Sequence, residues 1–489
     1  MKSVIRKHKK HILVLVLLLV LSYPIFRITF STSIYGDEWK IFWLGESALK
    51  TKTNIFVQTS GDLSYIFEVV TFNYLSKFFG YNGSYYYIFS YLTRIFASFS
   101  FFLFLRKVNL KNMSAFIGSL LFMVTPIGIE TTDWVRNFDS YLVIPLFLML
   151  INFCLELKNK KGSVKILLLL TVIILVNTTR SHGVFFVLLG LLSYRYIYNH
   201  SYRKLLFHTF LSVIFIYFIL SQTPIFGNQT ANLFQNFRFK DFIYSFFGNI
   251  GNTLIPNVNS WLIKFNSAFY LGIISFLSLL TLSLTHIFRF NRNNRSLICL
   301  SLLLSYSFML APLIRIPQIR ADSEHRYFIF SALVTPILIS IIADKLFNRK
   351  LKIIFGSAVA FLLLIFAAQS YKYLNLQNWA HSQKYTESLW SKITSQINPS
   401  EVQGNSFIVL TNPESYPKVN STVYFGSNYH LGLLYQIWYI DRLPEVWISP
   451  SLEFNKSNIP ESLFLKGRTP IIFRIHDSSV ERTIPTARP

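Results

Sequence analysis

Two adjacent acids, Asp37 and Glu38, follow the first long apolar run of the chain, which a cationic tail precedes. If the tail is cytoplasmic, both carboxylates emerge on the far face of a membrane, near the lipid head groups. A carboxylate at that depth could act as a general base where an acceptor meets a lipid-linked substrate. The structural alternative is a pair of solvated acids that cap an amphipathic helix starting near Trp39, because carboxylates favour helix N-termini.

A second charged group lies between two later apolar runs, in a turn of about ten residues that must stay close to the membrane. It comprises Glu130, Asp133, Arg136 and Asp139. Charges in such a place are costly unless they are paired or face a cavity. Asp139, at the start of the next run, is expected to point at the outer mouth of a helix bundle. The alternative is local pairing of Arg136 with Asp133 or Asp139, with Asp139 as an N-cap.

A third group precedes a late apolar run and breaks the charge bias of the other outer loops. Its members are Arg315, Arg320, Asp322, Glu324, His325, Arg326 and Tyr327. Arginine binds phosphate well through its forked donors, so a phosphate-bearing lipid is a natural partner. The alternative is a solvated loop with internal ion pairs. Arg94, in the middle of an apolar run, is also expensive where it stands and is expected to need an acid or a watery cavity.

The elements that position these groups are apolar runs. The chain has 489 residues and is 52% hydrophobic but only 14% charged, whereas soluble domains carry about 25% charged residues. The formal net charge of +25 comes from Lys and Arg clustered between apolar runs, as expected of cytoplasmic loops. No aromatic and basic platform or zinc-ligand spacing favours nucleic-acid binding. Two isolated cysteines, Cys154 and Cys299, are predicted to be packing residues.

The pattern predicts about eleven membrane spans with the N-terminus cytoplasmic and the C-terminus outside the cell membrane. The first apolar run lacks a small-residue cleavage site, so it is interpreted as an uncleaved span. The predicted spans are residues 11–30, 85–105, 113–129, 140–157, 164–179, 182–198, 205–222, 267–288, 297–315, 327–345 and 352–370. The predicted cytoplasmic segments each carry at least three Lys or Arg, which sets this topology.

Two outer loops are long. In the first, 31–84, apolar residues follow helical spacing near residues 39–49 and again in 63–79, with Asp62 as N-cap and Gly80 as stop. Both stretches are predicted to be helices lying in the membrane interface. The other long loop, 223–265, shows no clear pattern.

The last part of the chain reads like ordinary soluble sequence. Leu374 to Ile397 has the spacing of an amphipathic helix. Short strand-like runs follow at 407–410, 422–425, 446–448 and 471–475. The predicted fold class is thus an all-α polytopic membrane bundle, residues 1–370, with a small extracytoplasmic α/β domain, residues 371–489.

The three charged groups, in this order, resemble the GT-C superfamily of membrane glycosyltransferases, which includes protein O-mannosyltransferases and the aminoarabinose transferase of lipid A. That superfamily shows a DE or DD pair in its first outer loop, as at Asp37-Glu38, and that loop carries interfacial helices. Glu130, Trp134, Arg136 and Asp139 look like its second acidic loop, although the spacing from Trp134 to Asp139 is a residue shorter than expected. His325-Arg326-Tyr327 looks like the entry to a late helix.

The resemblance implies inverting transfer of a sugar from a polyprenyl-phosphate carrier to a protein, glycan or lipid acceptor on the outer face. Asp37 would deprotonate the acceptor, and Asp139 together with Glu38 would position acceptor or donor sugar. Arg326 together with Arg320 would stabilise the departing lipid phosphate, and Glu130, Arg136, His325 and Tyr327 would contribute to substrate binding. Some members of the superfamily use a divalent metal; acids are present here without clustered ligand spacing, so metal dependence stays open.

Two other classes stay open. A transporter or flippase of lipid-linked sugars would also need intramembrane charge, although inverted repeats and helices broken near the midplane are not evident. A polysaccharide polymerase or ligase would place its key Arg and His residues in a large late loop, whereas the acids of this chain come early.

Overall fold

The computed structural model describes slightly more than half of the chain. The described residues are 2–32, 34, 38, 41–42, 44–45, 48, 52, 63–142, 144–145, 238–288, 313, 317–323, 325–345, 349–376, 388, 391–397, 401, 406–411, 446–448, 469–476 and 479–483. The chain divides into two compact units. The first unit comprises residues 1–28, 60–67 and 88–373, and the second comprises residues 29–59, 68–87 and 374–489.

Three helices of the described part are long and apolar enough to cross a membrane: Lys9–Ser31, Gly83–Lys107 and Lys350–Asn375. They correspond to α1 (Lys2–Phe26) with the following 3-10 turn η1 (Arg27–Ser31), to α5 (Gly83–Lys107) and to α17 (Arg349–Leu376). These helices coincide with the predicted spans 11–30, 85–105 and 352–370. Three predicted spans, 164–179, 182–198 and 205–222, and most of 140–157 and 297–315, fall outside the described residues.

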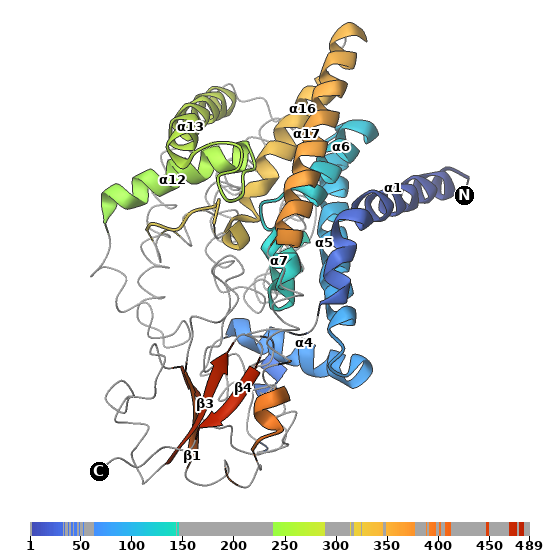
Figure 1. Cartoon of the computed structure of the whole chain (residues 1–489). Coiled ribbons are helices and arrows are strands. Elements are labelled where there is room, and N and C mark those ends of the chain that lie inside the picture. Colours follow the sequence, from blue (N-terminus) through green and yellow to red (C-terminus); the bar gives the residue numbers. More distant parts are fainter. Residues whose placement is uncertain are drawn as a thin grey trace. The chain divides into compact units, whose positions relative to one another are not determined.

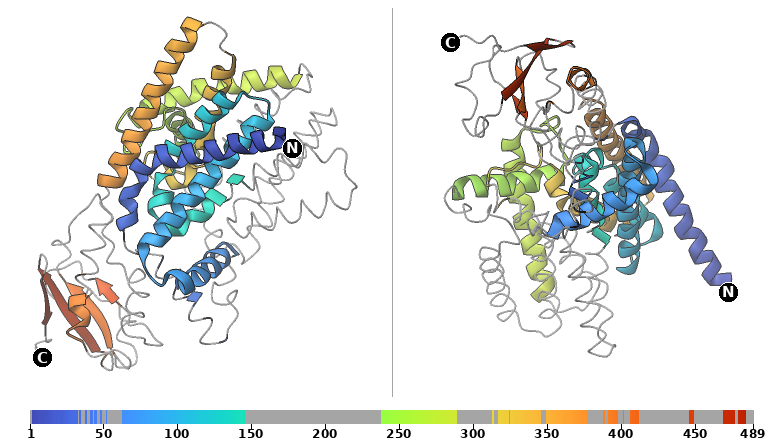
Figure 2. Two further views of the ribbon diagram at one scale, coloured as in Figure 1. Left: turned by 90° about the vertical axis from the view of Figure 1, so that its right-hand side faces the viewer. Right: turned by 90° about the horizontal axis from the view of Figure 1, so that it is seen from below.

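Helix α1 packs against α5 (Figure 2). The Tyr91 hydroxyl of α5 lies 2.9 Å from both the Leu19 carbonyl oxygen and Ser22 Oγ of α1. The Tyr91 ring also meets Phe26, with their centroids 5.4 Å apart. Because Ser22 Oγ also donates to the Leu18 carbonyl, at 2.6 Å, hydroxyl groups buried between the two apolar helices are satisfied locally.

Helix α6 (Asn112–Val124) ends earlier than the predicted span 113–129. The residue after it, Thr125, has an extended backbone with φ −59° and ψ 137°. Thr125 precedes Pro126, and the proline ring disfavours helical geometry in the residue before it. The chain therefore turns at Pro126 and continues in the short helix α7 (Ile129–Asp133) and the 3-10 turn η2 (Val135–Phe138).

The sequence of the predicted loop 223–265 shows no clear pattern, and its second half contains a helix. Residues Phe239–Leu254 form helix α12, which packs against α13 (Phe265–Phe288) (Figure 1). The helices approach closely at Gly251 and Gly272, where an added Cβ would lie 1.9 Å from the Ala268 carbonyl oxygen and 1.8 Å from that of Phe247. Glycine lowers intrinsic helix propensity, so the sequence of such a helix gives a weak helix signal. The close packing of the two helices nevertheless requires glycine at these positions.

The predicted span 327–345 does not begin as one continuous α-helix. Residues His325–Phe328 and Ser331–Leu333 form 3-10 turns, η5 and η6, and α16 runs from Val334 to Lys345. Pro336 therefore lies in the first turn of α16, where a missing backbone N–H costs no helical hydrogen bond. Its position fixes where the regular helix can start.

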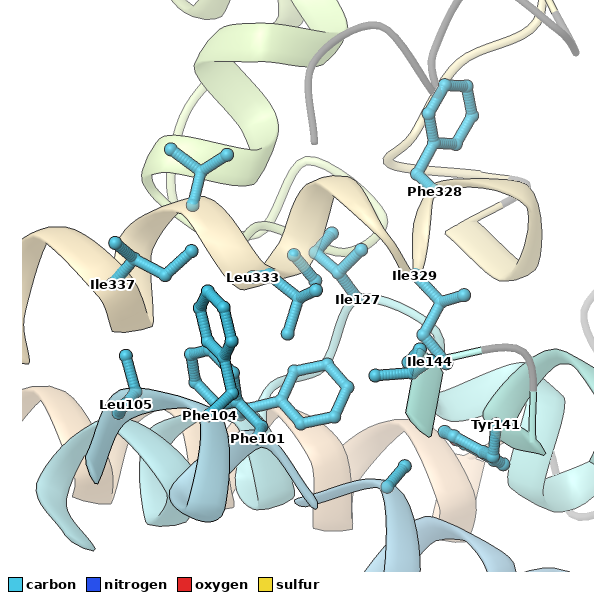
Figure 3. Packing of buried hydrophobic residues seen from close by; sticks show 14 of the residues in the cluster. Phe101, Phe104, Leu105, Ile127, Tyr141, Ile144, Phe328, Ile329, Leu333 and Ile337 are labelled. Carbon is cyan, nitrogen blue, oxygen red and sulfur yellow. The ribbon is translucent and has the colours of Figure 1, made fainter. Parts of the chain in front are cut away.

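The apolar core of the first unit joins α5, α6, α16 and the two segments that precede α16 and follow α6. In Figure 3, Leu333 and Ile337 lie across from Phe101, Phe104 and Leu105 of α5. Ile329 belongs to the same buried cluster as Ile127, Tyr141 and Ile144. The core therefore holds the segment around residue 328 against the turn around residue 127.

Residues 31–84, predicted to form an outer loop, belong mostly to the second unit and contain helical segments. Helix α4 spans Leu63–Phe79 and Gly80 follows it with φ 55°, so the predicted helix and its stop are confirmed. The predicted N-cap, Asp62, lies outside the described residues. Glu38, Ile41, Phe42, Leu44, Gly45 and Ala48 are also helical. Phe42 meets the rings of Phe72, Tyr81 and Tyr86 at centroid distances of 5.2–5.4 Å, so aromatic packing orders this loop.

The C-terminal part contains a four-stranded sheet in the order β2-β1-β3-β4 (Figures 1 and 2). Its strands are β1 (Ser406–Thr411), β2 (Val446–Ile448), β3 (Thr469–His476) and β4 (Ser479–Thr483). β1 pairs in parallel with β2 and β3, and β3 pairs antiparallel with β4. The predicted strands at 407–410, 446–448 and 471–475 are confirmed. The one at 422–425 lies outside the described residues, and β4 was missed because its largely exposed residues include two charges.

Candidate functional site

The turn between α6 and residue 139 is a rigid loop with its own hydrogen bonds. The backbone N–H groups of Ile129, Thr131 and Trp134 donate to the carbonyls of Pro126, Gly128 and Glu130, at 3.1, 3.0 and 2.8 Å. Gly128 has φ 80°, a conformation that side-chain-bearing residues rarely adopt. An added Cβ there would lie 2.8 Å from Ile329 Cγ1, so the turn and the segment before α16 are packed closely at this point.

Arg326, in η5, meets this turn through charge and aromatic contacts. Its Nη1 forms an ion pair with Glu130 Oε1, and its Nη2 lies 3.2 Å from the Tyr327 hydroxyl. The guanidinium carbon lies 4.9 Å from the centroid of the Trp134 ring and 4.6 Å from that of Tyr327. The Arg326 side chain keeps 20% of its surface exposed, and that of Glu130 keeps 8%. A guanidinium held by a carboxylate and two rings, yet still reachable, suits recognition of an anion.

Asp139 closes the turn and is fully buried. It follows η2, and its backbone N–H donates to the Asn137 carbonyl. The preceding Phe138 packs on Phe67 and Phe89, with ring centroids 5.9 and 5.1 Å away. Arg136 is half-buried. The turn therefore holds a buried carboxylate within ten residues of the pair formed by Glu130 and Arg326, on the same unit of the chain.

Arg320, the other predicted phosphate-binding arginine, lies in an ion pair of its own. Its Nε and Nη2 donate to Asp322 Oδ1 and Oδ2 at 3.0 and 2.6 Å, and its guanidinium lies 4.0 Å from the centroid of the Phe265 ring. Asp322 Oδ2 also accepts from Ser260 Oγ at 2.6 Å. Two nitrogens of the Arg320 guanidinium thus donate within the loop. For Arg320 and Asp322, the structure has the internal ion pair that was the alternative to phosphate binding.

Buried amides brace the same segment. Asn249 of α12 donates from Nδ2 to the Ile319 carbonyl at 3.0 Å and accepts the Ala321 N–H at Oδ1 at 2.7 Å. Asn249 is fully buried, and its side chain joins α12 to the segment before η5. The sequence did not single it out, because its surroundings read as a featureless loop.

The structure brings together members of the second and third predicted groups. Glu130 and Arg326 are in contact, and Tyr327, half-buried, borders them. His325 begins η5, and its side chain is outside the described residues. Asp37 also lies outside them, while Glu38 is helical, buried with 1% exposure, and belongs to the second unit.

Within the part of the chain that the structure describes, no group of three or more His, Cys, Asp and Glu is placed to hold a metal ion. Cys154 and Cys299 lie outside that part. Whether the protein depends on a metal therefore stays an open question, as it was from the sequence.

Comparisons with protein-family models, with curated proteins and with solved structures gave no match for this chain. In its described residues the protein is mostly helical, with three helices able to cross a membrane and a small sheet. These helices indicate a membrane protein, and its first unit contains an ion pair between a turn and an arginine as well as a buried carboxylate.

Proposed function

We propose that this protein is an inverting glycosyltransferase that moves a sugar from a polyprenyl-phosphate donor to an acceptor on the outer face of the membrane. One observation carries the proposal: Arg326 is held by Glu130 and two aromatic rings in the unit that also buries Asp139. The GT-C-like order of the charged groups in the sequence supports the same function. The three helices able to cross a membrane agree with a lipid-linked substrate.

In the proposed reaction, the acceptor hydroxyl oxygen attacks the anomeric carbon of the donor sugar. The bond from that carbon to the phosphate oxygen breaks, and polyprenyl phosphate leaves with the bonding electrons. The acceptor proton passes to Asp37, which acts as general base. Arg326 donates hydrogen bonds to the phosphate, where negative charge accumulates in the transition state. Asp139 would position the donor sugar or the acceptor, as the resemblance implies.

The environment of Arg326 fits a phosphate site that is ready before the donor arrives. Glu130 holds the guanidinium in place, and the rings of Trp134 and Tyr327 restrict it to one region. Such preorganisation reduces the ordering cost of binding and of the transition state. The two rings also offer apolar faces to the sugar or to the first prenyl unit.

The test uses the full-length protein in liposomes supplied with a panel of polyprenyl-phosphate sugars. Release of polyprenyl phosphate is measured with and without mixed protein, glycan and lipid acceptors. Arg326→Ala is expected to raise the donor KM and lower kcat, together at least about a hundredfold in kcat/KM. Arg326→Lys is expected to recover part of this loss, because a lysine keeps the charge without the fork.

Arg238→Ala serves as the control, since Arg238 is exposed just before α12 and its loss removes the same charge. Unchanged donor KM and kcat in Arg326→Ala would remove the phosphate role. Movement of intact donor across the bilayer without release of polyprenyl phosphate would identify a flippase instead.

A further inference from the structure

Arg94 has the largest fully buried side chain among the described residues, with 1% of its surface exposed. It lies within α5, one of the helices able to cross a membrane. A buried guanidinium at such a depth is costly unless its donors and charge are compensated. The sequence predicted an acid or a watery cavity beside it. Among the described residues its hydrogen-bond partners are instead neutral oxygens.

Two of these oxygens belong to the end of α6. Arg94 Nε donates to the Met123 carbonyl at 2.9 Å, and Nη2 donates to the Thr125 carbonyl at 2.7 Å. Carbonyls at a helix C-terminus lack helical partners and carry the negative end of the helix dipole. Arg94 therefore caps α6 with a full positive charge. This favourable interaction takes the role of the acidic partner that the sequence led us to expect.

The other two oxygens belong to Thr132, within the turn, and to Tyr141, just after it. Arg94 Nη1 donates to Thr132 Oγ1 at 3.1 Å and to the Tyr141 hydroxyl at 2.8 Å. The Tyr141 hydroxyl is also 2.7 Å from Thr132 Oγ1 and 2.9 Å from the Gly128 carbonyl. One side chain thus contacts the start of the turn at Thr125, its middle at Thr132, and the chain just past its end at Tyr141.

Rings enclose the same guanidinium. Its central carbon lies 4.8 Å from the centroid of the Phe26 ring and 5.4 Å from that of Tyr141. These contacts shield the charge while leaving its in-plane N–H groups free to donate. Only arginine can donate from three nitrogens in one plane to four separated oxygens; a lysine offers a single nitrogen.

The turn held in this way carries Glu130, which lies between Gly128 and Thr132 and pairs with Arg326. We propose that Arg94 is a positioning residue: by holding both ends of the turn, it fixes Glu130 and, through it, the Arg326 guanidinium that receives the donor phosphate. This inference rests on the proposed function for its catalytic consequence. The ordering of the turn by Arg94 does not depend on the proposed function, and a separate experiment measures it.

Two variants weaken this set of contacts by different amounts. Arg94→Lys keeps the charge and loses the fork. Tyr141→Phe keeps the ring and removes one hydroxyl that contacts Arg94, Thr132 and Gly128. The matched control is Tyr91→Phe, which removes a buried hydroxyl from the same helix α5 but one that contacts α1 at Leu19 and Ser22.

The first measurement is hydrogen–deuterium exchange on the full-length protein, followed in peptides covering residues 123–134 and 325–330. Arg94→Lys and Tyr141→Phe are expected to speed exchange at the turn amides of Thr131 and Trp134 about tenfold or more, and Tyr91→Phe is expected to leave them unchanged. The second measurement is the release of polyprenyl phosphate in liposomes. Both variants are expected to raise the donor KM about tenfold, whereas the acceptor KM stays within about twofold.

The outcomes separate the two proposals. Faster exchange at the turn in a protein that releases no polyprenyl phosphate even as wild type would sustain the positioning role and refute the proposed function. Activity with unchanged exchange and unchanged donor KM in Tyr141→Phe would overturn the positioning role. A loss of folded protein that lowers the maximal rate while leaving the donor KM of the remaining protein unchanged would also overturn it, because a purely structural residue has that effect. If Arg94→Lys fails to fold, Tyr141→Phe decides alone.

Discussion

Arg326 forms an ion pair with Glu130, a residue 196 positions earlier in the chain. The two belong to charged groups that the sequence shows as separate features, one in the turn after α6 and one before α16. Their contact places an arginine, a carboxylate and two aromatic rings at one point of the first unit. This contact gives the proposed phosphate site its geometry and leads to the first prediction.

Glu130 and Arg326 should be energetically coupled. Single substitutions Glu130→Gln and Arg326→Gln and the double substitution form a mutant cycle in denaturation experiments. Because both side chains are largely buried, we expect a coupling energy of about 1–3 kcal/mol. The exposed pair of Arg482 and Glu401, whose side chains keep 37% and 39% of their surface, is the control and should give less than about 1 kcal/mol. Equal coupling energies in both cycles would show that the buried pair stabilises the protein no more than the exposed pair does.

The close contact between α12 and α13 should be intolerant of a single methyl group at Gly272. A Cβ there would lie 1.8 Å from the Phe247 carbonyl oxygen, a backbone atom that cannot rotate away. We expect Gly272→Ala to destabilise the protein by about 1–3 kcal/mol, or more if the helices separate. Gly356→Ala on α17 is the control, because nothing lies within 4 Å of its Cβ position and alanine raises helix propensity. Thermal unfolding in detergent measures both; a Gly272→Ala variant as stable as Gly356→Ala would contradict the close helix contact.

Asn249 should matter more than its polar, loop-like sequence context indicates. Asn249→Ala removes the donor to Ile319 and the acceptor for Ala321, and leaves two buried backbone groups unsatisfied. We expect a loss of about 2–4 kcal/mol in the free energy of unfolding. Asn266→Ala is the control: this exposed residue accepts a bond from the Tyr244 hydroxyl, and its loss should cost less than about 1 kcal/mol. Similar losses of unfolding free energy in the two variants would argue against a stabilising role for the hydrogen bonds of Asn249.

Asp37→Asn should abolish sugar transfer while the protein still folds. An amide cannot accept the acceptor proton at neutral pH, so we expect a fall in kcat of at least about a hundredfold. Glu481→Gln in the exposed strand β4 is the matched removal of an acid and should leave transfer unchanged. Mass spectrometry of lipid-linked sugars in cells that carry each variant provides the measurement. Accumulation of the same unused donor in a deletion strain and in Asp37→Asn is expected; normal consumption in Asp37→Asn would rule out the base role.

Local rules account for the elements that the sequence predicted well. The apolar runs around α1, α5 and α17, the helix α4 with its glycine stop, and strands β1 to β3 each carry a periodic pattern or a turn residue that acts over a few positions. Where these predictions failed, a nearby proline or glycine decided. Pro126 ended α6 early, Pro336 delayed α16, and glycines of α12 masked a helix that tight packing requires.

The sequence by itself determined that this is a chain of apolar helices with charged groups placed between them, because hydrophobicity and helix signals are properties of short stretches. It also supplied the three groups from which the proposed chemistry follows. Only the tertiary structure decided the partners: Glu130 for Arg326, Asp322 for Arg320, and carbonyl and hydroxyl oxygens for Arg94. Those pairings depend on which helix ends meet in space. A sequence offers an arginine many acceptors of the same chemical type, but only a few of them lie within hydrogen-bond distance once the helices pack.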